Sequence, residues 1–258
     1  METLTVEQRG PVGIITFNRP QKMNALNKTV FAELAEVFAG YRRDETIRAV
    51  ILTGGEKIFG VGADIDMMGS MGGIFGGRDF SGKVHRLFAN IENMPKPVIA
   101  AIAGFALGGC LELALTCDVR IASEGAKLGL PEITLGVLPG AGGTQRLPRL
   151  VGQGWAKLML YTGKPLDAAE CYRIGLVQQL APQGELLDAA QRLAEEMAAR
   201  PAVALATIKD MVNTGSALDL TSALRYEARG FGMLLGTEDY REGIQAFIEK
   251  RQPQFKHR

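Results

Sequence analysis

The sequence predicts an α/β fold that is followed by an all-helical C-terminal region. Short apolar runs typical of buried strands, AVILT at 49–53 and VIAAI at 98–102, alternate with segments of helical periodicity through the first two-thirds of the 258 residues. After about Gln183 no further strand pattern occurs, and helical patterns continue to the C-terminus. We therefore divide the chain into an α/β core of residues 1–195 and a helical region of residues 196–258.

The first predicted elements are a hairpin and a helix. Residues 4–8 and 12–17 are β-type runs joined by Arg-Gly-Pro. An apolar helical stripe begins after Asn27, and both Asn24 and Asn27 are candidate N-caps. The stripe consists of Val30, Phe31, Leu34, Val37, Phe38 and Tyr41.

The later elements follow from the same periodicities. A helix is expected around residues 84–91 and ends before Pro95, and residues 119–122 form a further strand. Residues 186–197 have the pattern of an amphipathic helix, and Pro201 is well placed as the first residue of the next one.

Composition and charge narrow the function classes. The 29 basic and 28 acidic residues nearly balance, so neither nucleic acid nor an anionic membrane is expected as a partner. Cys110, Cys117 and Cys171 are odd in number and form no C-x-x-C pair, so we expect no disulfide framework and no zinc site. A reducing compartment fits this cysteine usage, and we expect a cytoplasmic protein. The N-terminus lacks the pattern of a signal peptide, and no uncharged apolar run reaches the 18 residues of a membrane span.

One apparent motif does not hold. Residues 77–83 match the phosphate-loop pattern G-x-x-x-x-G-K, but Val84 stands where the motif needs serine or threonine, and no strand precedes it. We interpret the glycine-rich segment 69–82 as a mobile surface loop. The only histidines, His85 and His257, make a histidine-based nucleophilic or metal site improbable, and no metal is expected.

Two glycine turns are candidates for binding an oxyanion. Gly108 and Gly109 follow a buried strand and open a short helical run, where backbone N–H groups are unpaired. Gly62 and Ala63 follow a different strand and could direct a second N–H to the same point. Two such donors form an oxyanion hole. The alternative for each is an ordinary tight turn between a strand and a helix.

Two glutamates lie in apolar surroundings near these turns. Glu112 comes one helical turn after Gly109, and Glu132 precedes the apolar run ITLGVLPG. Burial would raise their pKa values toward the range that suits general acid–base chemistry beside a carbonyl group. The alternative is that each glutamate pairs with an arginine such as Arg120 or Arg146.

Five segments in this order resemble the crotonase family, also called the enoyl-CoA hydratase/isomerase superfamily. The resemblance covers essentially the whole chain and rests on FNRPQKMNAL (17–26), FGVGADI (59–65), KPVIAAIAGFALGGCLELAL (96–115), LGLPEITLGVLPGAGGTQRLPRLVG (128–152) and EDYREGIQAFIEKRQPQFK (238–256). It implies a spiral core of repeated ββα units. It also implies that the C-terminal helices pack against neighbouring subunits in a homotrimer or homohexamer.

The resemblance also implies a site and a reaction. The oxyanion-hole N–H groups fall on Ala63 and Gly109, and Gly140 supplies an N–H near the catalytic water. Glutamate at both Glu112 and Glu132 favours a 2-enoyl-CoA hydratase of fatty-acid β-oxidation or related acyl-CoA degradation. Such an enzyme adds water reversibly, in the syn sense, to give 3-hydroxyacyl-CoA. We assign water activation to Glu112 and proton donation at Cα to Glu132. No cofactor is implied, because CoA is part of the substrate.

Contacts to CoA are implied as well. They fall on Lys22, Ala25, Ala63, Asp64 and Ile65 and, from C-terminal residues that can reach a neighbour's site, on Phe231, Phe247 and Lys250. Two positions depart from the family pattern. Asp66 stands where related hydratases often have lysine, so the CoA contacts at this position can differ. Cys110 stands where glycine is usual, and its side chain either narrows the acyl pocket or packs in the core without reaching it.

Other functions on this sequence stay open at this point. A Δ3-Δ2-enoyl-CoA isomerase or a specialised pathway hydratase would use the same fold, and an isomerase needs only the acid at Glu132. A non-catalytic scaffold or an RNA-associated member is the alternative of another class. The balanced charge and the lack of a lysine/arginine cluster speak against RNA.

Overall fold

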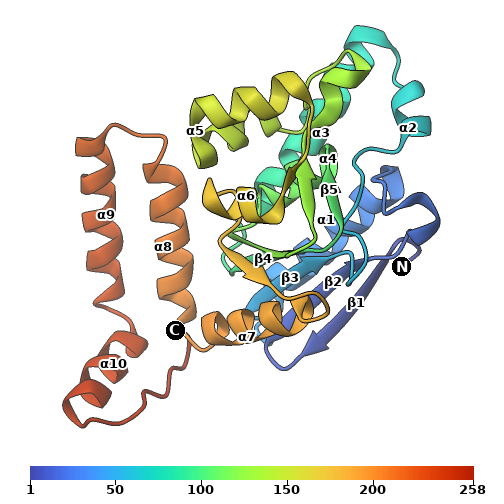
Figure 1. Cartoon of the computed structure of the whole chain (residues 1–258). Helices are drawn as coiled ribbons and strands as arrows, with labels where there is room; N and C mark the ends of the chain where they lie inside the picture. Colours follow the sequence, from blue (N-terminus) through green and yellow to red (C-terminus); the bar gives the residue numbers. More distant parts are fainter.

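Two sheets form the centre of the protein, which we describe over residues 1–258 from a computed structural model (Figure 1). In the larger sheet the order is β1-β2-β3-β4-β6-β9; β1 pairs antiparallel with β2, and the remaining pairs are parallel. Its strands are β1 (Leu4–Arg9), β2 (Val12–Phe17), β3 (Ala49–Thr53), β4 (Val98–Ile102), β6 (Val119–Ser123) and β9 (Gln179–Ala181). The smaller sheet, in the order β5-β7-β8, contains β5 (Phe105–Leu107), β7 (Lys127–Gly129) and β8 (Leu166–Asp167).

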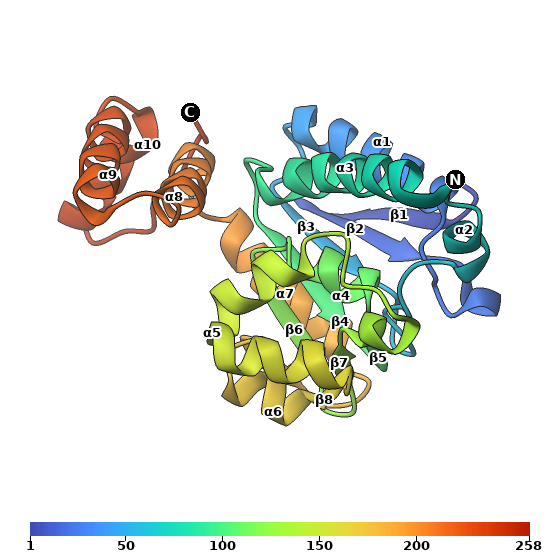
Figure 2. The ribbon, with the colours of Figure 1, turned by 90° about the horizontal axis from the view of Figure 1, so that it is seen from above.

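Helices cover both faces of the larger sheet, which is why its central strands are continuous apolar runs. On one face lie α1 (Lys28–Arg43) and α3 (Gly73–Glu92), and on the other lies α7 (Leu186–Ala198) (Figure 2). Side chains of β3 alternate between the two faces of the sheet. Val50 and Leu52 pack in the core under α1 and α3, whereas Ala49 and Ile51 pack in the core under α7.

Shorter helices and turns follow several of the strands. They are α2 (Ile65–Gly69), α4 (Gly109–Ala114) and α6 (Ala168–Arg173), together with the 3-10 turns η1 (Pro20–Lys22) and η2 (Pro131–Leu135). The longer α5 (Gly143–Thr162) bends at Gly152, whose backbone is not helical. Loops at the carboxyl ends of parallel strands usually carry the site of an α/β protein, and here they lead into α2 and α4.

The C-terminal helices stand apart from the sheets. Figures 1 and 2 both show α8 (Ala202–Gly215), α9 (Leu220–Leu234) and α10 (Glu238–Ile248) to one side of the core. Gly230 lets α8 and α9 approach closely, because a side chain there would meet the Met211 sulfur at 2.9 Å. The division predicted at residues 195 and 196 falls in the last turn of α7, which still packs on the sheet.

Most predicted elements are confirmed. The hairpin has the expected strands, and Asn27 caps α1 by accepting a hydrogen bond from Val30 N at 2.9 Å. Pro201 lies one residue before α8, so the prediction that it is the first residue of this helix is wrong. Asn24 was a wrong choice for a cap: its side chain instead accepts from Arg19 N and donates to the Ile58 carbonyl, each at 3.0 Å.

The prediction of a loop at residues 69–82 is wrong. Residues 65–69 form α2, and α3 begins at Gly73 despite the low helix propensity of glycine. Tertiary packing overrides that propensity, because Phe80 and Phe88 of α3 both stack against Phe31 of α1. The G-x-x-x-x-G-K segment therefore lies inside a helix and forms no phosphate loop.

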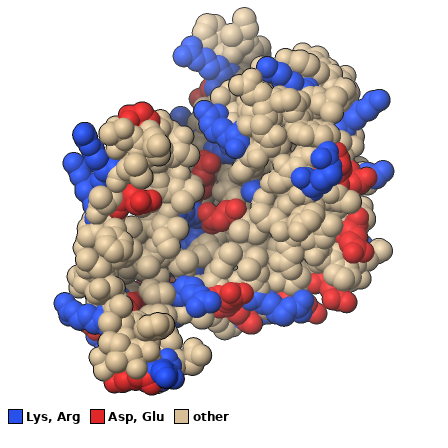
Figure 3. All heavy atoms as spheres, turned by 60° about the vertical axis from the view of Figure 1, so that its left-hand side comes forward, with Lys and Arg blue, Asp and Glu red and all other residues tan.

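Charged side chains are mixed in sign on the face that Figure 3 shows, where basic and acidic groups alternate without one large field of either sign. No helix in the structure is both long enough and apolar enough to cross a membrane.

Candidate active site

Two glycine turns meet at the start of α4. Gly62 has φ +103° and Gly108 has φ +51°, conformations that side chains disfavour. A Cβ on Gly62 would lie 3.1 Å from the Leu107 carbonyl oxygen, and one on Gly109 would lie 3.6 Å from Ala63 N. The backbone angles favour glycine at positions 62 and 108, and the contact at Gly109 shows that the turns bring the N–H groups of Ala63 and Gly109 close together.

Both N–H groups are available to a ligand. On either side of Ala63, the Gly62 carbonyl accepts from Leu26 N at 2.7 Å and Asp64 N donates to the Leu26 carbonyl at 2.8 Å, but Ala63 N–H donates to no protein acceptor. Gly109 is the first residue of α4, so the helix offers its N–H no partner. Both residues line a cavity, in which the two donors can bind one oxygen atom.

Glu112 lies one turn further along α4 and is almost fully buried, with 3% of its surface exposed. Its Oε1 accepts hydrogen bonds from Ala141 N and Gly143 N, both at 2.7 Å. Burial raises the pKa of this carboxyl group, while the two N–H groups and the charge of Arg146 act in the opposite direction. Glu112 is thus a buried carboxylate whose charge is stabilised by backbone donors.

The loop of residues 140–143, whose N–H groups donate to Glu112, is held in place by Arg146 and Ser81. Arg146 donates to the Ala141 carbonyl at 3.2 Å and forms an ion pair with Glu92 at 2.8 Å. Ser81 of α3 donates to the Gly140 carbonyl at 2.5 Å and lies 3.3 Å from His85 Nε2. The sequence contained no signal for Ser81, because its partner is a main-chain carbonyl 59 residues away.

Glu132 is the second carboxyl group of the cavity and has a different environment. It lies in η2, where its Oε2 is buried without any hydrogen-bond partner. Burial, and secondly the charge of Glu112, raise its pKa to about 7. Its Oε1 would lie 3.0 Å from a Cβ on Gly108. Glu132 can therefore hold a proton near neutral pH, and the two backbone N–H donors favour the ionised form of Glu112.

Neither glutamate pairs with an arginine, so that alternative is wrong. Arg120 donates to the carbonyls of Leu176 and Cys117, at 2.7 and 2.9 Å, and Arg146 forms its ion pair with Glu92. Both carboxyl groups are left to face the cavity.

The cavity has a volume of about 350 Å³ and is mostly apolar. Both glutamates and the residues Ala63, Gly109 and Gly140 line it. Its apolar wall includes Phe31, Val61, Met71, Phe80, Val84, Phe88, Val137 and Leu138. No group of three or more histidine, cysteine or acidic side chains is arranged to hold a metal ion.

Comparison with known proteins gives the family. The sequence model of the family described as enoyl-CoA hydratase/isomerase matches residues 7–258. The chain belongs to the enoyl-CoA hydratase/isomerase family. It is 46% identical to a probable enoyl-CoA hydratase of Rhizobium meliloti, across 100% of this chain and 99% of that protein. It is 43% identical to a short-chain-enoyl-CoA hydratase of Clostridium acetobutylicum, with the same coverage.

The fold of the enoyl-CoA hydratase/isomerase family is likewise confirmed. The crystal structure of an enoyl-CoA hydratase from Bacillus anthracis superposes with a TM-score of 0.95 at 40% identity, across 99% of this chain and 100% of that one. The α/β class with helical C-terminus was therefore predicted correctly.

Several residues expected to contact CoA in this family gather at one edge of the cavity. Ala63 and Ile65 line it, and the side chain of Ile65 is 64% exposed. Lys22 lies beside α2, where its Nζ is 3.3 Å from Asp66 Oδ2. Ala25 is buried next to the bridge that pairs Leu26 with Ala63.

The Asp64 side chain, unlike Ala63 and Ile65, does not line the cavity. Its carboxylate binds Arg19 at 3.0 Å and caps α2 by accepting from Asp66 N at 3.1 Å. The side chain is buried by these two contacts and serves the local fold.

Phe231, Phe247 and Lys250 do not join the cavity within this chain. Phe231 belongs to α9 and Phe247 to α10, and Lys250 lies two residues after α10; Figures 1 and 2 show these helices well away from α2 and α4. Phe231 and Phe247 are 65% and 84% exposed. Within a single chain, no other residue covers most of the surface of these two aromatic side chains.

Cys110 packs behind the oxyanion turns and does not narrow the cavity. Its fully buried Sγ accepts a hydrogen bond from Gly62 N at 3.3 Å, and a side chain on Gly60 would collide with it. This departure from the family pattern therefore supports the position of the Gly62 turn.

Proposed function

We propose that the protein catalyses the reversible syn addition of water across the 2,3 double bond of a 2-enoyl-CoA thioester, which gives a 3-hydroxyacyl-CoA. The observation that carries this proposal is the pair Glu112 and Glu132. The two carboxyl groups face one cavity beside two free N–H donors and differ in the hydrogen bonds that stabilise their charges. An acid and a base beside an oxyanion hole are what hydration of a conjugated thioester requires.

In this proposal the N–H groups of Ala63 and Gly109 bind the thioester oxygen and stabilise the enolate that forms when water attacks. The ionised Glu112 takes one proton from the water as its oxygen bonds to Cβ, and the Gly140 N–H orients that water. Glu132 then donates its proton to Cα. After the reaction Glu112 is protonated and Glu132 is ionised. Proton exchange with solvent after product release restores the ionised Glu112 and the protonated Glu132.

No cofactor enters this scheme, since CoA is part of the substrate and the protein groups account for every proton. The assignment of Glu132 as the acid is supported by its Oε2, which is buried without a hydrogen-bond partner. Such an oxygen suits an acid that must release its proton to carbon.

We further propose a homotrimer or a hexamer built from two trimers. Support comes from the C-terminal helices, where Leu220, Phe231 and Met233 are 65–75% exposed and α8 contains no buried residue. Such uncovered apolar side chains are typical of subunit interfaces. In this arrangement Phe231, Phe247 and Lys250 contact the CoA of a neighbouring subunit.

For the setting of the reaction, we propose fatty-acid β-oxidation or a related acyl-CoA degradation in the cytoplasm. Three buried and unpaired cysteines, Cys110, Cys117 and Cys171, are compatible with a reducing compartment.

The test is a spectrophotometric assay with crotonyl-CoA, in which hydration removes the absorbance of the conjugated thioester. Activity on a panel of enoyl-CoA substrates is expected, and no loss of absorbance with short, medium or branched substrates would refute the proposal. Glu112→Ala separates hydration from isomerisation of a 3-enoyl-CoA. An isomerase needs one acid and would keep full activity in this variant.

A further inference from the structure

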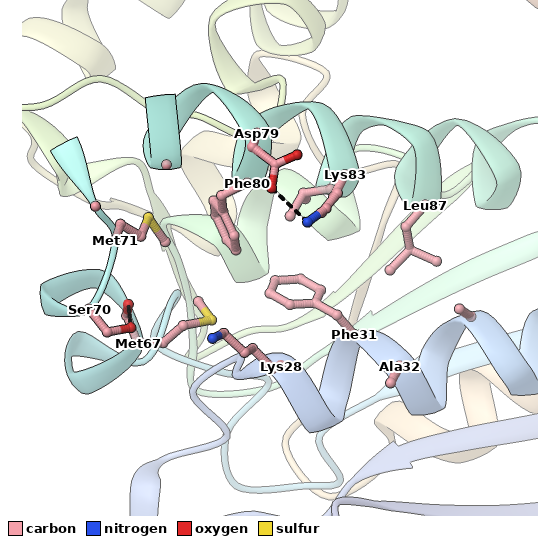
Figure 4. Close-up of a pocket in the computed structure, with 14 residues that line it drawn as sticks. Lys28, Phe31, Ala32, Met67, Ser70, Met71, Asp79, Phe80, Lys83 and Leu87 are labelled. Carbon is pink, nitrogen blue, oxygen red and sulfur yellow. Dashed lines mark hydrogen bonds and ion pairs between the residues drawn. The ribbon is translucent and has the colours of Figure 1, made fainter. Parts of the chain in front are cut away.

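The cavity that Glu112 and Glu132 line adjoins a second cavity of about 590 Å³, which lies between α1, α2 and α3 (Figure 4). The residues that line both cavities are all apolar: Phe31, Met71, Phe80 and Val84. In the second cavity Asp79 and Lys83 form an ion pair with each other at 2.6 Å (Figure 4). The wall on this side of the glutamates therefore carries no charged group.

A charged side chain does contact the loop of residues 140–143, and it is Arg146 of α5. Its Nη1 donates to the Ala141 carbonyl at 3.2 Å, and the N–H of the same Ala141 donates to Glu112 Oε1 at 2.7 Å. The guanidinium group also packs on Gly142, where an added Cβ would collide with Nη1. One residue of the loop, Ala141, thus contacts Arg146 through its carbonyl and Glu112 through its N–H.

Glu92 fixes the orientation of Arg146. The Nε and Nη2 atoms of Arg146 donate to the two carboxylate oxygens of Glu92, at 3.1 and 2.8 Å. Such a two-point contact holds the plane of the guanidinium group as well as its position. Glu92 is the last residue of α3, and its carbonyl accepts a hydrogen bond from Asn213 of α8 at 3.1 Å. The pair is therefore anchored on three helices.

The charges of this pair act on Glu112 in opposite directions. The positive charge of Arg146 lowers the pKa of Glu112, against the larger effect of burial. The negative charge of Glu92 compensates Arg146, so it works against the ionised form of Glu112. Other titratable groups lie around these three side chains: Cys110 and Glu132 near Glu112, His85 and Arg149 in the polar cavity that Arg146 lines, and Lys209, which lines a cavity with Glu92 but pairs with Asp118 at 2.7 Å.

We propose that Arg146 is a positioning residue of the reaction: held by Glu92, it fixes the loop whose N–H groups bind Glu112, and its charge keeps that carboxylate ionised for proton abstraction. This inference rests on the proposed hydratase function. Arg146 does not line the cavity of the two glutamates, so it acts through Ala141 and Glu112 and not on the substrate.

Two variants separate the charge of Arg146 from its hydrogen bonds. Arg146→Gln keeps a donor for the Ala141 carbonyl but removes the charge, whereas Arg146→Lys keeps the charge but loses the two-point contact with Glu92. We expect kcat for crotonyl-CoA hydration at pH 7 to fall at least about tenfold in both, with KM within about twofold. Arg149→Gln is the matched control, since Arg149 is exposed on the same helix and donates to Gln145; it should keep wild-type kcat. Equal kcat in the control and the Arg146 variants would overturn the proposal.

The pH profile tests the electrostatic part of the proposal. At low pH kcat/KM falls as the base takes up a proton, so the acidic limb follows the pKa of Glu112. This limb should move to higher pH in Arg146→Gln, stay near the wild type in Arg146→Lys, and move to lower pH in Glu92→Gln, which leaves the charge of Arg146 uncompensated. If the pair did no more than hold the loop, Arg146→Gln and Glu92→Gln would both weaken the donors to Glu112. Movement of both limbs in the same direction would therefore overturn the proposal.

A measurement without substrate separates this inference from the proposed function. The carboxyl bands of Glu112 are followed by infrared spectroscopy across pH, as the difference between each protein and the same protein with Glu112→Gln. The titration midpoint should be highest in Arg146→Gln, intermediate in the wild type and lowest in Glu92→Gln. The same midpoint in all three would overturn the role of Arg146 even where crotonyl-CoA is hydrated. The expected order in a wild type that hydrates nothing would overturn the hydratase proposal alone.

Discussion

At the scale of single residues, Glu112 and Glu132 carry the same carboxyl group but have different hydrogen-bond partners. Two N–H donors stabilise the ionised form of Glu112, whereas nothing stabilises a charge on Oε2 of Glu132. The sequence predicted both residues, from apolar neighbours and family resemblance. It could not predict the donors at Ala141 and Gly143, which come from a loop 29 and 31 residues away.

Replacing either glutamate by glutamine should abolish proton transfer with little change in shape. We expect kcat for crotonyl-CoA hydration to fall by about 10²–10⁴ in Glu112→Gln and in Glu132→Gln. The exposed Glu124→Gln serves as a control and should keep wild-type activity. Activity within tenfold of the wild type in either glutamine variant would contradict the assigned roles.

The raised pKa of Glu132 also affects stability. Its pKa is about 7 in the folded protein and 4.5 ordinarily, so the folded state binds the proton more tightly. The contribution of this group is therefore fully present below about pH 4.5 and is lost as the pH rises through about 7. Glu132→Gln should gain about 1–2 kcal/mol in free energy of unfolding over the wild type between pH 5 and pH 8, allowing for partial solvent access. Urea titrations at pH 5 and pH 8 measure the free energy of unfolding of both proteins. A difference between them that does not change with pH would refute the raised pKa of Glu132.

At the scale of elements, the junction of β5 and α4 determines the position of the proposed oxyanion site. Gly108→Ala introduces a Cβ at φ +51° and 3.0 Å from Glu132 Oε1. Gly10→Ala is a matched control, since Gly10 has φ +56° but no atom within 4 Å of an added Cβ. Both variants should lose about 1–3 kcal/mol of stability from backbone strain, and Gly108→Ala should lose more, because its ψ of −132° lies outside the left-handed helical region. Only Gly108→Ala should also lose kcat, because it displaces the acid, and equal kcat in the two variants would count against this site.

The helix α3 positions the loop that contacts Glu112. Ser81→Ala removes the hydrogen bond to the Gly140 carbonyl, so the Gly140 N–H, which we propose to orient the attacking water, is less well placed. We expect kcat to fall about tenfold with KM nearly unchanged, and Ser81→Thr to restore part of it. A rise in KM alone, measured in steady-state kinetics, would show that Ser81 acts on substrate binding instead.

This helix also shows where sequence reasoning fails at the element scale. Its glycines predicted a loop, because propensity is summed over neighbours in the chain. The contacts of Phe80 and Phe88 with Phe31 come from a helix more than 40 residues earlier, and they decide the conformation.

At the scale of the whole molecule, the helices α8 to α10 leave large apolar side chains uncovered. Leu220→Lys and Met233→Lys place charges on residues that are 75% and 70% exposed. We expect light scattering to give a trimer or hexamer for the wild type and a smaller species for these variants, while Thr221→Lys, an exposed polar neighbour, remains assembled. A wild-type monomer would refute the assembly.

The sequence by itself determined the fold class, the buried strands, the helix cap at Asn27 and the identity of the residues at the proposed site. These follow from local periodicity, turn chemistry and short segments that resemble a family. Only the tertiary structure decided that Glu112 is held by backbone donors, that Oε2 of Glu132 has no hydrogen-bond partner and that a second cavity adjoins the one the two glutamates line. Hydrogen bonds and cavities of this kind join residues distant in the chain, so their energies depend on distances that no local pattern contains.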